Sequence, residues 1–120
     1  MGRNVTISMI NATGFDWGDL HTNIERGKFN QDPPSVVLNE NMGVFQAGNR
    51  TGAQIGPKGS ISYSMGSTGV RVFITWDHPF SASTSTYTCY SEPEGEITAT
   101  LSPNNPTGHN QSITFTVEQI

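Results

Sequence analysis

Six segments of this 120-residue chain alternate apolar with polar side chains at a period of two. They are residues 5–9, 60–65, 70–76, 86–90, 97–101 and 112–117. In residues 70–76, for example, Val70, Val72, Ile74 and Trp76 fall on one side of an extended chain. Successive side chains of a β-strand point to opposite faces, so the pattern predicts half-buried strands. No segment repeats apolar residues at helical spacing over the length of a helix.

Weaker strand candidates lie at residues 21–29, 36–38 and 44–47, and turn residues separate all these segments. The turns are rich in Gly and Pro, at residues 12–14, 32–34, 65–69, 93–95 and 103–108. Short strands at such regular spacing are typical of a sandwich or barrel. We predict an all-β, single-domain antiparallel β-sandwich of about eight to nine short strands spanning residues 1–120.

The charge balance narrows the classes of partner. The formal net charge is −4, and the six basic residues are scattered along the sequence from Arg3 to Arg71. A nucleic-acid-binding protein needs clustered Lys and Arg, so nucleic acid is excluded as a partner. The same balance disfavours attachment to anionic lipid by charge alone, and leaves zwitterionic or neutral surfaces open.

No pattern of catalytic or metal-binding residues is present in the sequence. Cys89 is the only cysteine, and His21, His78 and His109 have no ligand spacing with one another. We therefore expect no enzyme, no catalytic residue, no metal and no cofactor. The first residues lack the layout of a signal peptide, and no apolar run is long enough for a spanning helix. A protein made in the cytoplasm and stored or released without a leader is the expectation.

Aromatic residues concentrate between Phe73 and Tyr90. A proline cannot donate to a strand ladder, so Pro79 should end the strand and leave an exposed turn. The predicted membrane- or ligand-binding residues are Trp76, Asp77, His78, Pro79, Phe80, Tyr87 and Tyr90. Trp76 also continues the apolar face of its strand, so a place in the core is an equal alternative for it, whereas Phe80 is expected to face a ligand. Burying one Phe-sized side chain contributes about 1.5–3 kcal/mol, so such a loop alone gives marginal, reversible membrane binding.

Four stretches carry a family resemblance: RGKF at residues 26–29, FQAGNRTGAQIGPKGSISYSM at 45–65, VRVFITWDHPF at 70–80 and GHNQSITFTV at 108–117. In their order and spacing, over nearly the whole chain, the sequence resembles the aegerolysins, small β-sandwich proteins of fungi and bacteria. It is most similar to the aegerolysin-type small subunits of bacterial two-component insecticidal crystal toxins. More distantly, the YSM stretch and the strand ending in proline and an aromatic resemble actinoporins.

The resemblance implies recognition of a lipid or receptor at a target-cell membrane and, with a larger partner protein, permeabilisation of that membrane. Trp76, Asp77, Pro79 and Phe80 fall on the family's W-D-x-P-[WF] loop. Arg26 stands where fungal members have a tryptophan, and Gln54 or Ile55 stands where they carry an acidic residue. Sphingolipid specificity therefore does not carry over to this chain.

Three functions follow as hypotheses. The first is a membrane-binding, pore-forming or cytolytic toxin component of insecticidal or haemolytic type that acts with a larger pore-forming partner. The second is a lectin-like or receptor-binding module without lytic activity. The third is a structural or storage protein that assembles through its sheet edges, and a homo-oligomer is a further open alternative.

Overall fold

The computed structural model describes residues 3–80 and 84–120 and contains, in those residues, nine β-strands and no helix. The strands are β1 (Asn4–Ala12), β2 (Trp17–Arg26), β3 (Lys28–Gln31), β4 (Met42–Gly48), β5 (Lys58–Met65), β6 (Arg71–Asp77), β7 (Thr86–Glu92), β8 (Ile97–Ser102) and β9 (Asn110–Gln119). All six strongly alternating segments lie in strands. The predicted all-β fold is confirmed.

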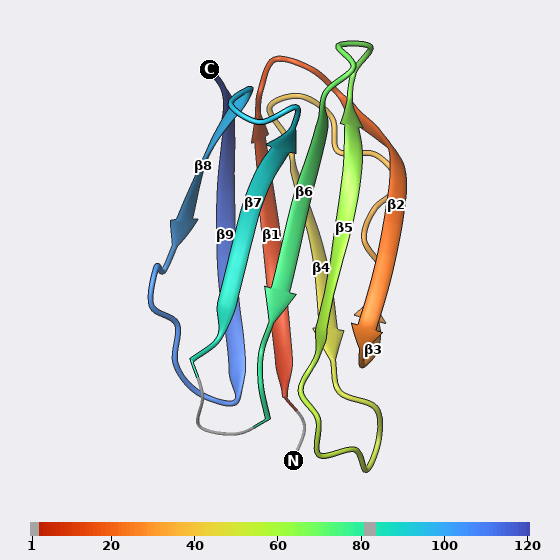
Figure 1. The fold of residues 1–120 in the computed structure, drawn as a ribbon, viewed down its shortest axis with the longest axis vertical. Helices are drawn as coiled ribbons and strands as arrows, with labels where there is room; N and C mark the ends of the chain where they lie inside the picture. The colour runs from red at the N-terminus through yellow and green to blue at the C-terminus, as the bar shows by residue number, and fades with distance from the viewer. Residues whose placement is uncertain (1–2, 81–83) are drawn as a thin grey trace.

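The strands form two sheets packed face to face (Figure 1). One sheet has the order β3-β4-β1-β9-β8 and the other the order β2-β5-β6-β7. Neighbouring strands are antiparallel, except that β1 and β9 run parallel from Asn4↔Asn110 to Ala12↔Glu118. No tight turn joins these two strands, so the geometry that makes hairpins antiparallel does not act on this pair.

The structure differs from two of the weaker strand predictions. Residues 21–29 divide between β2 and β3, which belong to different sheets. Residues 36–38 form no strand and make only a single bridge, between Val37 and Trp17. Pro33 and Pro34 precede that bridge, and prolines have no N–H with which to extend a ladder.

The core lies between the sheets, where the inward-facing residues of both interdigitate. Burial alternates along β1, β6 and β9, as period-two patterning requires. The largest fully buried side chains include Trp17, Phe45, Tyr63 and Trp76. The sequence pattern therefore identified which face of each strand is buried.

The connection between β3 and β4 closes one open side of the sandwich. The Tyr63 hydroxyl donates to the Pro34 carbonyl over 2.7 Å, and the Asn11 side-chain amide donates to the Val37 carbonyl over 3.0 Å. These bonds hold the backbone of the connection and leave the side chains of Val36, Leu38 and Met42 exposed.

The two ends of the sandwich differ in their connections. One end carries residues 49–57, 103–109 and the described parts of the β6–β7 connection, residues 78–80 and 84–85; we call it the loop end (bottom of Figure 1, near the N-terminus). The opposite end carries the short connections at residues 13–16, 66–70 and 93–96 and the C-terminus; we call it the turn end (top of Figure 1). Strands position everything described below at one of these two ends.

Candidate functional site

Three of the predicted site residues lie in the interior. Trp76 is 1% exposed, and its ring lies 5.3 Å from that of Phe45 and 5.8 Å from that of Phe29, centroid to centroid. His78 is 2% exposed and Tyr87 8%. The prediction that His78 and Tyr87 face a ligand is wrong, and for Trp76 the structure has the alternative that was left open, a place in the core. The strand runs on through Asp77, so the inward register of Val72 and Ile74 continues to Trp76 and His78 before Pro79 breaks it.

Tyr87 pairs with Trp76 across β6 and β7. Its hydroxyl donates to Gln111 Oε1 over 2.6 Å, which joins the four-stranded sheet to β9 of the other. Burial raises the pKa of Tyr87 to about 12. Tyr87 is therefore a neutral hydrogen-bond donor between the sheets.

Asp77, Pro79 and Phe80 lie together at the loop end and are partly exposed. Arg26 Nη2 donates to Asp77 Oδ1 over 3.1 Å. The guanidinium of Arg3 lies 4.9 Å from the centroid of the Phe80 ring, within cation–π range. An aromatic ring with a cation against it is thus available at this end of the molecule.

Tyr90 lies on a different surface, the outer face of the four-stranded sheet. It is 41% exposed and stacks on its cross-strand partner Phe73, with centroids 5.2 Å apart and planes 6° apart. The structure therefore brings together Asp77, Pro79 and Phe80. Tyr90 helps to line one hollow with Asp77 but neither of the hollows that Pro79 and Phe80 help to line.

Sequence reasoning missed the other residues of the loop end. Ile55, in the β4–β5 connection, is 55% exposed. A hollow of about 500 Å³ is lined by Lys28, Arg50 and Phe80 together with several amide side chains. A second hollow, of about 390 Å³, is lined by Arg3, Pro79 and His109 among others. These residues are far apart in sequence, so no local motif could have marked them.

Charge is strongly segregated between the two ends. Five of the six basic residues lie at the loop end: Arg3, Arg26, Lys28, Arg50 and Lys58. Only two carboxylates lie there, Glu25 and Asp77, and both are in ion pairs. Seven carboxylates and one basic residue lie at the turn end: Asp16, Asp19, Glu40, Glu92, Glu94, Glu96 and Glu118, with Arg71. The loop end therefore has a formal excess of three positive charges, although the protein is acidic.

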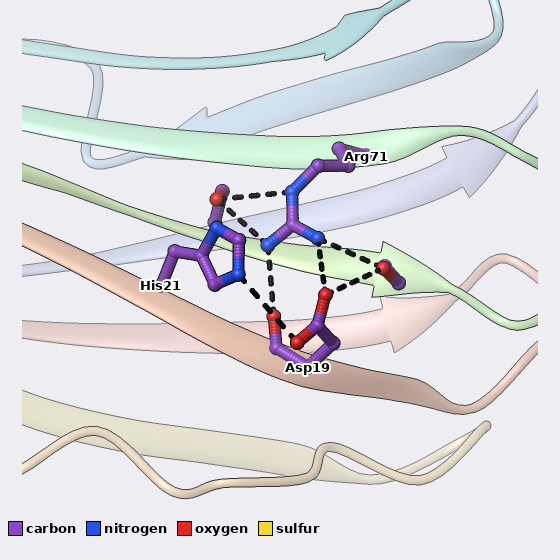
Figure 2. A network of polar contacts seen from close by, with 5 residues as sticks. Asp19, His21 and Arg71 are labelled. Carbon is purple, nitrogen blue, oxygen red and sulfur yellow. Dashed lines mark hydrogen bonds and ion pairs between the residues drawn. The ribbon is translucent and has the colours of Figure 1, made fainter.

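The single basic residue of the turn end is held in a polar network (Figure 2). Arg71 Nη1 donates to Asp19 Oδ2 over 2.9 Å, and Nη2 donates to the Asp19 carbonyl over 2.8 Å. The hydrogen bond from Arg71 lowers the pKa of the Asp19 carboxyl. Asp19 has a φ of 50° where the pairing of β2 with β5 is irregular, so the guanidinium braces a strained bulge.

Within residues 3–80 and 84–120, no three His, Cys, Asp or Glu side chains are grouped so that they could hold a metal ion. The same residues include no helix long and apolar enough to cross a membrane. The loop end presents basic side chains, amide groups and two apolar side chains, the exposed Ile55 and the partly exposed Phe80.

Comparison with known proteins identifies the fold. No protein-family model matches the chain, and no curated protein sequence matches it significantly. Among solved structures, the lipid-binding protein Nakanori matches with a TM-score of 0.80 at 16% identity, over 98% of this chain and 71% of that one. The RahU protein, solved with a TRIS molecule, matches with a TM-score of 0.78 at 17% identity, over 98% and 96%. IP-1A from Alcaligenes faecalis matches with a TM-score of 0.72 at 16% identity, over 98% and 91%. The chain thus shares its fold with a lipid-binding protein, at identities that establish the fold alone.

Proposed function

We propose that this protein binds lipid membranes through its loop end and acts there as the membrane-recognition component of a cytolytic system. The observation that carries the proposal is the combination of charge and apolar surface at that end. Five basic side chains lie at the same end as the exposed Ile55 and the partly exposed Phe80. Three of them, Arg3, Lys28 and Arg50, lie beside the Phe80 ring or line a hollow with it. Membrane-surface proteins use this combination, because apolar side chains enter the acyl boundary while cations meet the head groups.

The overall negative charge does not oppose this orientation. The molecule is 42 Å long, whereas the Debye length at physiological salt is about 8 Å. A bilayer that meets the loop end is therefore screened from the carboxylates of the turn end. The net charge alone suggested that anionic lipid is disfavoured, and the arrangement of charge in space removes that objection.

Two further observations support a cytolytic role with a larger partner. The chain has the fold of a protein described as lipid-binding, and its sequence resembles the aegerolysins, of which several members permeabilise membranes with a larger protein. The exposed side chains of Val36, Leu38 and Met42 lie near the turn end. When the loop end contacts a membrane, these three side chains lie away from the bilayer, and they form an apolar surface that a partner protein could bind.

The apolar part of the contact can be tested with Phe80→Ala and Ile55→Ala. Each change should weaken sedimentation with vesicles of phosphatidylcholine and phosphatidylserine about tenfold, because each removes about 1–2 kcal/mol of apolar burial. Leu38→Ala and Met42→Ala are the controls, since they remove apolar side chains that are as exposed as Ile55 and lie near the other end. No binding by the parent protein, or equal losses in all four variants, would contradict the proposal.

Permeabilisation is tested separately with the same vesicles. The protein alone should bind them and release less than a few per cent of an entrapped dye, because the proposal assigns the pore to the partner. Extensive leakage with the protein alone would show that no partner is needed.

Glycan recognition is the second candidate function, and the outer face of the four-stranded sheet favours it. Tyr90 and Phe73 stand there as an exposed stacked pair beside a hollow that Asn23, Ser60 and Thr86 help to line. Aromatic faces next to hydroxyl and amide groups suit sugar rings. Inhibition of cell binding by a soluble saccharide, lost in Tyr90→Ala and unaffected by Phe80→Ala, would favour this function over lipid binding.

A further inference from the structure

One buried histidine connects the loops of the loop end. His78 Nδ1 lies 2.8 Å from Ser85 Oγ, at the far side of the β6–β7 connection. Its Nε2 lies 2.6 Å from the carbonyl oxygen of His109, in the β8–β9 connection. Its backbone N–H donates to the Pro57 carbonyl over 2.9 Å, in the β4–β5 connection. All three connections of the loop end thus meet at this residue.

The neighbouring backbone packs closely against it. A Cβ atom placed on Gly56 would lie 1.7 Å from the His78 carbonyl oxygen, so only glycine fits there. The backbone of His78 is therefore held closely against the β4–β5 connection.

The hydrogen bonds fix the tautomer of the neutral ring. The carbonyl of His109 can only accept, so Nε2 carries the hydrogen and donates it. In the neutral imidazole Nδ1 is then an acceptor, and Ser85 Oγ donates to it. A second proton on Nδ1 could still be accepted by Ser85 Oγ once that hydroxyl turns, so it is the burial of the ring, which is 2% exposed, that opposes the charged form.

The surroundings also oppose a positive charge on the ring. The charges of Arg3, from the segment before β1, and of the His109 ring act against it. The hydrogen bond to the His109 backbone carbonyl and the charge of Asp77 on β6 favour it. Tyr87 on β7 is neutral. Burial is the largest effect, and together these groups hold the pKa of His78 below its ordinary value of 6.5.

We propose that His78 is a pH-sensitive latch that keeps the loop end closed at neutral pH and lets its loops open in mildly acidic surroundings. The inference rests on the proposed membrane function, for which it supplies regulation. Opening frees the connection that holds Phe80 and adds a positive charge to an already basic surface. Both changes favour adsorption to an anionic bilayer, so acidification strengthens the membrane contact.

The lowered pKa of His78 determines in which direction the balance between closed and open molecules shifts with pH. Above pH 6.5 the imidazole is neutral in both states, and the closed state keeps its full stability. Below pH 6.5 the open state takes up a proton that the closed state refuses, so the ratio of open to closed molecules rises by up to tenfold per pH unit. The rise stops once the pH passes the lowered pKa of the closed state.

Hydrogen exchange of the protein without lipid tests the latch itself. Protection of the amides in residues 49–57, 78–80, 84–85 and 103–109, corrected for the intrinsic rate, should fall between pH 7.4 and 5.5 by up to about tenfold. In His78→Gln the amide group can still accept from Ser85 and donate to His109, yet it cannot titrate, so protection should be independent of pH. His109→Gln is the matched control, because it removes a neighbouring imidazole and keeps the backbone carbonyl that His78 contacts, and it should retain the response of the parent.

Protection that is the same at both pH values, or a response that persists in His78→Gln, would overturn the latch. Sedimentation at both pH values with vesicles of phosphatidylcholine and phosphatidylserine forms the second arm. Binding by the parent should strengthen at pH 5.5, and binding by His78→Gln should strengthen less. If protection falls at pH 5.5 but the protein binds no vesicles at either pH, the latch is upheld and the membrane function is overturned. If the protein binds vesicles but protection does not change with pH, the membrane function is upheld and the latch is overturned.

Discussion

Trp76→Ala is expected to lower the free energy of unfolding by about 3–5 kcal/mol, as loss of a fully buried tryptophan does. The indole fills the space between Phe29 and Phe45, and no small side chain can replace those contacts. Urea-induced unfolding followed by circular dichroism measures the loss. A loss below about 1 kcal/mol would mean that the site collapses around the smaller residue or that the ring does not lie in the core.

Trp76→Phe is the matched variant. The indole Nε1 has no hydrogen-bond partner among the described residues, so a benzene ring gives up volume without giving up a hydrogen bond. Its cost should be about 1–2 kcal/mol. This comparison matters for function, because weak vesicle binding by Trp76→Ala would reflect damage to the sandwich. Phe80, at the surface, is the informative position for the membrane contact.

Reversing two charges at the loop end should weaken binding to anionic vesicles by about a thousandfold. Lys28 and Arg50 line one hollow beside Phe80 and are both exposed. A basic side chain near an anionic surface contributes about 1 kcal/mol, and a reversal replaces that attraction with a repulsion of similar size, so Lys28→Glu with Arg50→Glu should cost about 4 kcal/mol. Sedimentation with vesicles that contain phosphatidylserine measures the change.

Glu94→Lys with Glu96→Lys provides the control. It also reverses two exposed charges, yet at the turn end, several Debye lengths from the bilayer in the proposed orientation. Its effect on vesicle binding should be small at physiological salt. Equal effects from both pairs would mean that net charge governs binding and that the loop end has no special role.

The architecture followed from local pattern, because the period of two shows which residues share a buried face. The same rule places Trp76 in the core, in register with Val72 and Ile74. The mistaken expectation for His78 came from Pro79: a strand break was taken to expose the residue before it, whereas the inward alternation continues through Trp76 to His78. The alternation of apolar and polar residues therefore identified the buried side chains correctly, and the conclusion that Pro79 exposes its neighbours in the strand was wrong.

The basic surface could not be seen in the sequence. Arg3, Lys28 and Arg50 lie far apart along the chain, and only the order of the strands brings them to one end. Strand order depends on long-range pairing, for which a single sequence has no local signal. Ile55 was missed for a related reason, since one apolar residue in a Gly- and Pro-rich connection gives no periodic pattern.

The parallel pairing of β1 with β9 bears on how the protein is made. In the five-stranded sheet, β1 has β9 as one of its two neighbours, and Asn4 pairs with Asn110, more than a hundred positions later in the sequence. A ribosome must have synthesised the chain beyond Asn110 before β9 can pair with β1, and until then β1, already paired with β4 on its other side, presents an unpaired edge. Folding dominated by such distant pairings is slow, in the range of milliseconds to seconds. The nascent chain is thus prone to aggregate through the exposed edge of β1 until β9 has been made. A sandwich whose neighbouring strands were all joined by hairpins would avoid this.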